Sequence, residues 1–164
     1  MDRCAKIIEH RKYRLYLEKN ESLEAERIYC RHHFEHLLTV ARLTYLLLLE
    51  EGQPFISREI AYAAGLLHDI GRFKEYQAGG DHAELSSELA GPILEEAGFK
   101  LSERLLIEKA IAQHRTDDSD HIHRSPLSKA LSKADKYARL CFRCKASDNC
   151  YKLEHQPHKG RLIY

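Results

Sequence analysis

The sequence contains few of the residues that interrupt helices. Its 164 residues include four prolines, eight glycines, one methionine and no tryptophan. Abundant Leu, Ala, Glu, Lys and Arg favour helices over strands. Charge of one sign is also lacking, because 26 Lys and Arg residues face 25 Asp and Glu residues. No global field therefore recruits nucleic acid or an anionic membrane, and an anionic substrate has to be held by a local site.

Long hydrophobic runs are absent as well. The longest leucine run, Leu46–Leu49, is far shorter than the ~20 apolar residues of a membrane-spanning helix. The charged N-terminus has no apolar core of the kind found in signal peptides. Five cysteines are an odd number, and their distribution fits reduced thiols better than a disulfide framework. Together these features predict a cytoplasmic protein with no membrane partner.

Apolar residues recur at helical spacing along nearly the whole chain, without strand-like alternation. We therefore expect one all-α bundle over residues 1–144 and a Cys-, His- and Lys-rich extension over residues 145–164. Start signals such as Ser57, Asp81 and Pro126 help to place the helices. The expected helices cover residues 3–19, 30–50, 57–71, 82–92, 102–114 and 126–144, with a loop at 72–81.

Six histidines and aspartates are candidate metal ligands. They fall on different expected helices or helix ends, and inward-facing side chains of a bundle can converge on one point. His68 and Asp69 are adjacent at a helix end, where both side chains can reach a metal ion placed over the terminus. Asp135 lies among small and apolar residues, where an unpaired carboxylate is costly. The six are His36, His68, Asp69, His82, His114 and Asp135.

The order of these residues, in the segments HLLTVA, GLLHDIGRF and SKADKYA, resembles the HD-domain superfamily of metal-dependent phosphohydrolases. The resemblance covers about Cys30 to Leu140 and implies an all-α HD-domain helical bundle. It implies that one divalent transition metal is bound by His36, His68, Asp69 and Asp135.

Two further histidines match members of the superfamily that hold a dinuclear centre. His82 and His114 stand where such members supply ligands to a second ion, and Asp69 would then bridge the two ions. The resemblance thus implies a centre of two divalent ions of Fe, Mn, Co or Ni. The alternative is that His82 and His114 donate hydrogen bonds to a substrate phosphate.

The activity implied by the resemblance is hydrolysis of a nucleotide-like phosphomonoester or phosphodiester by a metal-activated water. His68 and Asp69 form the HD pair. Arg72 and Lys74 follow this pair and Lys136 follows Asp135, so these cations are candidates for binding substrate phosphate. The expected substrate is a small-molecule phosphate or nucleotide, and the oligomeric state is left open.

Asp69, Arg72 and Asp81 are the expected catalytic residues. Asp81 would orient His82 or accept a proton, and helix capping explains its position equally well. Some one-metal nucleotidases of the superfamily carry a glutamate shortly after the HD pair. In this sequence Glu75 lies at the wrong spacing to replace that glutamate, which disfavours the one-metal mechanism.

Three other functions compete with hydrolysis. The same six ligands can hold two iron ions that activate oxygen, as in an HD-type diiron oxygenase, or the chain can be an inactive nucleotide-binding module. His32, Glu35 and His36 spell H-x-x-E-H, the inverzincin pattern of a zinc peptidase. A peptidase leaves the HD pair and the later ligands unexplained.

The C-terminal cysteines Cys141, Cys144 and Cys150 form a C-x2-C-x5-C pattern, followed by His155 and His158. Three thiols and a histidine can make a structural Zn site, although the spacing differs from paired C-x2-C knuckles. Free thiols on a terminal extension are the alternative. An iron–sulfur cluster would need a fourth cysteine from a distant part of the chain.

Overall fold

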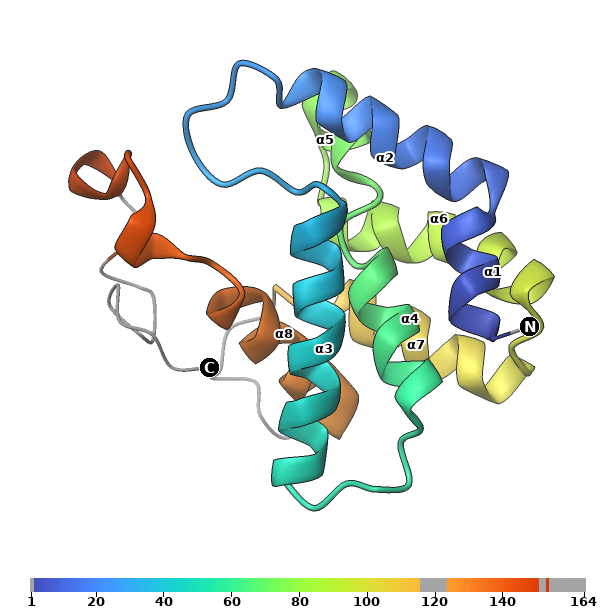
Figure 1. Ribbon diagram of the computed structural model, residues 1–164. Coiled ribbons are helices and arrows are strands. Elements are labelled where there is room, and N and C mark those ends of the chain that lie inside the picture. Colours follow the sequence, from blue (N-terminus) through green and yellow to red (C-terminus); the bar gives the residue numbers. More distant parts are fainter. Residues whose placement is uncertain (1, 116–123, 151–152, 154–164) are drawn as a thin grey trace.

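The computed structural model describes residues 2–115, 124–150 and 153, and all the regular structure in these ranges is helical. This confirms the predicted all-α class. None of the described helices is both long and apolar enough to cross a membrane. The elements are α1 Arg3–Glu9, α2 Arg11–Leu23, α3 Phe34–Glu50, α4 Arg58–Leu67, α5 Arg72–Ala78, α6 His82–Ala97, α7 Leu101–Ala112, α8 Pro126–Tyr137 and the short 3-10 helices η2 Cys141–Arg143 and η3 Ser147–Asn149 (Figure 1).

The core lies where α3 packs against both α4 and α8 (Figure 1). Residues Leu37, Ala41 and Leu48 of α3 are fully buried there. The approach of α3 to α4 depends on Gly65, because a Cβ atom at that position would lie 2.3 Å from the Cα atom of Ala41. The glycine therefore allows α4 to deliver the residues that follow it close to α3.

The expected helix over residues 3–19 is two helices. His10 has an extended backbone with ψ 129°, so it ends α1 and begins α2. Its ring Nδ1 accepts a hydrogen bond from the backbone N–H of Lys12 at 3.1 Å, which caps the second helix. Since this cap depends on histidine acting as an N-cap, apolar periodicity does not reveal the break.

The expected loop at residues 72–81 was wrong, because α5 occupies most of it. Phe73 is buried on α5 and stacks on Tyr16 of α2 with ring centroids 5.5 Å apart. Its backbone N–H donates to the side-chain Oδ1 of buried Asn20 at 2.7 Å. The short helix is thus stabilised by packing on α2, which local sequence does not show.

Several other helix ends differ from expectation. Helix α3 begins at Phe34 rather than residue 30, and α4 ends at Leu67 rather than residue 71. Helix α6 continues through Pro92 to Ala97, although the proline lacks the N–H that would bond the carbonyl of Glu88. Burial of Ile93 and Leu94 beyond the proline offsets that loss. Helix α8 ends at Tyr137 rather than near residue 144, and the chain continues as the turns η2 and η3.

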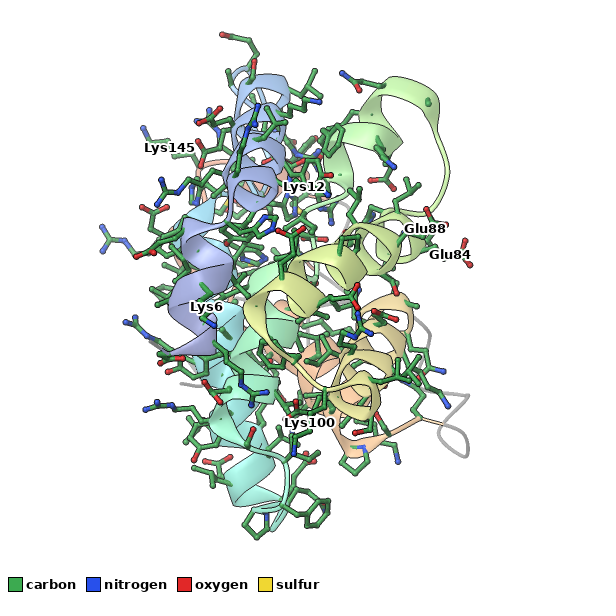
Figure 2. The ribbon with its side chains drawn as sticks, turned by 90° about the vertical axis from the view of Figure 1, so that its right-hand side faces the viewer. Lys6, Lys12, Glu84, Glu88, Lys100 and Lys145 are labelled. Carbon is green, nitrogen blue, oxygen red and sulfur yellow. The ribbon has the colours of Figure 1, made fainter. Side chains whose placement is uncertain are left out.

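Helix α6 illustrates how the bundle separates polar from apolar faces. Figure 2 shows Glu84 and Glu88 projecting outward from it, and both are exposed. The opposite face, with His82, Ala83 and Ser86, is buried. His82 therefore points into the bundle because it lies on the core side of an amphipathic helix.

Candidate metal centre

The structure brings all six predicted ligands together inside the bundle. Their ligand atoms form two groups, and within each group all the atoms lie within 4.8 Å of one another. Asp69 belongs to both groups. The first group is His36, His68, Asp69 and Asp135, and the second is Asp69, His82 and His114.

Each ligand comes from a different place in the helical frame, apart from the adjacent HD pair. His36 lies on α3, Asp135 on α8, and His82 is the first residue of α6, whereas His114 follows α7. The HD pair lies in the turn between α4 and α5. Five separate segments therefore have to be packed correctly before the groups exist.

The turn that carries His68 and Asp69, the HD turn, packs closely against α6 at Gly71. A Cβ atom there would lie 2.6 Å from the backbone nitrogen of Ser86, and the Gly71 N–H donates to Ser86 Oγ at 2.9 Å. Behind the turn, Asn20 Nδ2 donates to the carbonyl oxygen of Asp69 at 3.0 Å. These contacts fix the backbone that carries both HD side chains.

The two carboxylate oxygens of Asp69 face different groups. Oδ2 lies 3.3 Å from His68 Nε2, whereas Oδ1 lies 3.2 Å from His82 Nε2 and 3.8 Å from His114 Nε2. In the first group, His36 Nε2 lies 3.1 Å from Asp135 Oδ1. This is the arrangement expected of a carboxylate that can bridge two ions.

Several of these buried atoms make no hydrogen bond within the described ranges. A buried polar atom without a partner is costly, so such a cluster indicates a missing partner such as a cation. Imidazole nitrogens and carboxylate oxygens are suitable donors for a divalent transition metal. The atoms are Nε2 of His36, His68 and His82 and both carboxylate oxygens of Asp69.

The other ring nitrogen of three histidines faces an acceptor. His68 Nδ1 lies 2.7 Å from the carbonyl oxygen of Gly65, and His114 Nδ1 lies 2.7 Å from that of Ile111. His82 Nδ1 lies 3.0 Å from the carboxylate of Glu75. In a neutral ring such contacts place the proton on Nδ1 and leave the Nε2 lone pair free to bind a metal ion.

Burial and neighbouring charges set the protonation states of the candidate ligands. Burial opposes the charge of Asp69, but the charges of Arg72 and His68 hold its pKa well below the usual range. Arg139 outweighs burial at Asp135 in the same way, and that pKa is also well below its usual range. Burial lowers the pKa of His114 to about 4, so its ring is neutral at pH 7. Burial opposes the charge of His68, but Asp69 and Asp135 raise its pKa to about 10, so its ring is charged at pH 7. Ionised carboxylate and neutral imidazole are the forms that bind metal, so a metal ion would have to replace the proton on His68.

His32 and Glu24 are a buried pair beside the centre. Glu24 accepts from the His32 ring Nδ1 and from its backbone N–H, both at 2.6 Å. The His32 Nε2 atom lies 3.7 Å from Asp69 Oδ2. The sequence singled out His32 as part of the H-x-x-E-H pattern, and it did not single out Glu24, because a glutamate in a polar connection gives no sign of burial.

The predicted substrate-binding and catalytic cations lie at different depths. Arg72 is buried, with Nε 3.0 Å from Asp69 Oδ2. Lys74 and Lys136 are partly buried on α5 and α8. Arg139 was missed by sequence reasoning, yet it donates to both oxygens of Asp135 at 2.9 and 2.8 Å. Its i,i+4 spacing from that aspartate is the signal that could have found it.

Asp81 lies at the start of α6. Its carboxylate accepts from the backbone N–H of Ala83 at 2.8 Å and from Arg115 at 3.2 Å. The side chain that faces His82 Nδ1 is Glu75. The structure therefore gives Asp81 a capping position and places Glu75 where it can orient the imidazole.

A cavity of about 1090 Å³ borders the first ligand group. It lies between the connection that precedes α3 and the segment that follows α8. Two of its lining residues belong to the candidate metal centre: His36 is a ligand of the first group, and Arg139 donates to Asp135. Its basic lining residues are Arg27, Arg31, Arg139, Arg143 and Lys145. A phosphate-bearing molecule has both room and positive charge there.

Known proteins are similar to this chain in sequence. An uncharacterized protein of Clostridium beijerinckii is 35% identical over 150 residues, which are 92% of each chain. Ribonuclease Y of Enterococcus faecalis is 35% identical over 82 residues, which are 50% of this chain but only 14% of the ribonuclease.

A solved structure supports the same fold. A predicted HD superfamily hydrolase from an uncultured Thermotogales bacterium superposes with a TM-score of 0.60 at 28% identity, covering 77% of this chain and 65% of that one. The HD domain profile matches residues 33–140, a span that contains all six ligands. The chain therefore belongs to the HD-domain family.

Proposed function

We propose that the protein is a metal-dependent phosphohydrolase that acts on a nucleotide-like phosphomonoester or phosphodiester. The observation that carries the proposal is the position of Asp69, whose two buried carboxylate oxygens face two separate groups of candidate ligands. Ions held by these groups would lower the pKa of a bound water and polarise a phosphoryl oxygen.

The residues around the groups keep the ligands in place. Arg72 and Arg139 compensate the charges of Asp69 and Asp135, so both carboxylates stay ionised in a buried setting. Glu75 and the carbonyl of Gly65 orient two imidazoles. The chain thus preorganises the donor atoms instead of assembling them as the substrate arrives.

Substrate phosphate is proposed to enter from the cavity. Arg139 lies both on its wall and against Asp135, so an anion in the cavity is next to the first ligand group. Arg31 and Arg143 add positive charge farther along the wall. We propose that the partly buried Lys74 and Lys136, and Arg72 deeper in the site against Asp69, hold further phosphate oxygens. A substrate with more than one phosphate, or a phosphodiester, uses this charge best.

Hydrolysis of a defined panel tests the proposal. Metal-free protein is supplied in turn with Mn, Fe, Co or Ni ions and offered p-nitrophenyl phosphate, bis-p-nitrophenyl phosphate, dinucleoside polyphosphates and short RNA. The expected result is metal-dependent release of product that Asp69→Ala abolishes and that the exposed variant Glu88→Ala retains. Turnover in metal-free Asp69→Ala protein would contradict it, and oxygen uptake by the iron form without hydrolysis would favour the oxygenase instead.

A further inference from the structure

Four of the five cysteines line one cavity. Cys30 belongs to the connection between α2 and α3, whereas Cys141, Cys144 and Cys150 follow α8. All four are partly buried and carry free thiols. In Figure 1, η2 and η3 lie on the same side of the bundle as the connection that contains Cys30. The fold therefore joins a cysteine to three others that are more than a hundred residues away in the sequence.

The three later cysteines lie on a tightly turned backbone. The N–H of Cys144 donates to the carbonyl of Cys141 at 3.2 Å, which closes the C-x2-C turn. A second turn, Ser147–Asn149, brings Cys150 back to the same wall, and its N–H donates to the carbonyl of Ser147 at 3.1 Å. Both turns therefore lie along the wall of the cavity that Cys30 also lines.

The connection that carries Cys30 is also folded on itself. Arg31 donates to the carbonyl oxygens of Ala25 at 3.0 Å and Arg27 at 3.2 Å. The next residue, His32, is held by Glu24. Cys30 thus directly precedes two residues that are held by hydrogen bonds within this connection.

The thiols are close enough to influence one another. Burial is the main cause that raises the pKa of Cys141, and the thiols of Cys30, Cys150 and Cys144 raise it further. Four neighbouring thiols in a partly buried cavity repel one another once they are ionised. A bound cationic centre removes that repulsion.

We propose that Cys30, Cys141, Cys144 and Cys150 form a four-thiolate site for a thiophilic metal centre, either a zinc ion or an iron–sulfur cluster. Four cysteine thiolates are the ligand set that both centres use, and neither requires another residue. The sequence predicted a site of three cysteines and one histidine, with His155 and His158 as the candidates. Both histidines lie outside the described residues. The fourth ligand instead comes from the connection before α3.

Such a centre would tie two segments that lie beside the HD ligands. Cys30 is two residues from His32, whose ring faces Asp69, and Cys141 is two residues from Arg139, which pairs with Asp135. Binding of a metal would therefore fix both walls of the cavity that borders His36. The role is structural and does not depend on which substrate the protein hydrolyses.

Sulfur-specific spectroscopy tests this site separately from the HD ligands. Protein purified without oxygen is examined for visible absorption and for zinc, iron and sulfide content. A second sample is stripped of metal and loaded with cobalt(II), whose thiolate complexes absorb strongly. Cys30→Ser is compared with Cys4→Ser, a matched control at a buried cysteine of α1 that lies outside the cavity.

The expected result is a thiolate–metal signal in the unaltered protein and in Cys4→Ser, and its loss in Cys30→Ser. Iron with sulfide and visible absorption identifies a cluster, and zinc without sulfide identifies a single ion. The Asp69→Ala variant should keep the signal, because its ligand set has no sulfur. Absence of a thiolate signal in the unaltered protein, or an unchanged signal in Cys30→Ser, would overturn the proposal.

Discussion

Asn20 is the residue whose replacement tests best how the fold supports the HD turn. It is fully buried, and its amide donates to the Asp69 carbonyl while its oxygen accepts from the N–H of Phe73. In Asn20→Ala both backbone groups lose a partner inside the protein. At roughly 1–3 kcal/mol for each unsatisfied buried group, we expect a loss of about 2–6 kcal/mol. For a chain of this size that lowers the Tm by at least about 4 °C.

The assay compares thermal unfolding and metal affinity of Asn20→Ala with those of Glu21→Ala, an exposed neighbour on the same helix. The surface variant should stay within about 0.5 kcal/mol of the unaltered protein. Because Asn20 holds the backbone of Asp69, its loss should also weaken metal binding about 10- to 100-fold, as other changes behind a ligand do. If Asn20→Ala matches Glu21→Ala in both measurements, the reasoning is refuted.

Other substitutions test other parts of the account. Gly65→Ala should lower stability by about 1–3 kcal/mol or more in thermal unfolding, because its Cβ would meet Ala41; an unchanged Tm would mean that α3 and α4 are not in this contact. Asp69→Ala should abolish bound metal and turnover together in elemental analysis and activity assays. Arg72→Ala should raise KM for the phosphate substrate while bound metal remains, and loss of all metal would contradict its substrate role. Burial opposes the charge of Glu24, but hydrogen bonds from His32 and Tyr76 lower its pKa from 4.5 to about 2. Its contribution to stability is therefore present above pH 4.5 and lost as the pH falls towards 2, and Glu24→Gln should flatten that part of a urea-unfolding profile.

The ligands could be predicted from the sequence because their chemistry is carried by residue type and order. His68 and Asp69 are adjacent, and Asp135 is an acidic residue among small and apolar neighbours. Each of these candidate ligands can therefore be recognised from the residues next to it in the sequence. Helical periodicity also predicts the class of fold. These signals do not depend on knowing which helices touch.

The residues that support the ligands could not be predicted in the same way. Asn20 and Glu24 look like polar residues of a connection, and only packing of α2 against α5 shows that they are buried. Helix α5 itself depends on the contact between Phe73 and Tyr16. Cys30 lines the same cavity as the later cysteines only because the chain returns to the same side of the bundle. Such effects are tertiary, and local pattern carries no trace of them.

The most direct test of the central claim is a titration of metal-free protein with manganese(II). Calorimetry measures the number of bound ions, and hydrolysis of bis-p-nitrophenyl phosphate measures activity in the same samples. Manganese favours carboxylate over thiolate, so the cysteines should contribute little. If Asp69 bridges two groups, the unaltered protein binds about two ions and gains activity as they bind, whereas Asp69→Ala does neither. A single ion in the unaltered protein, or full activity without any, would contradict the two-group centre.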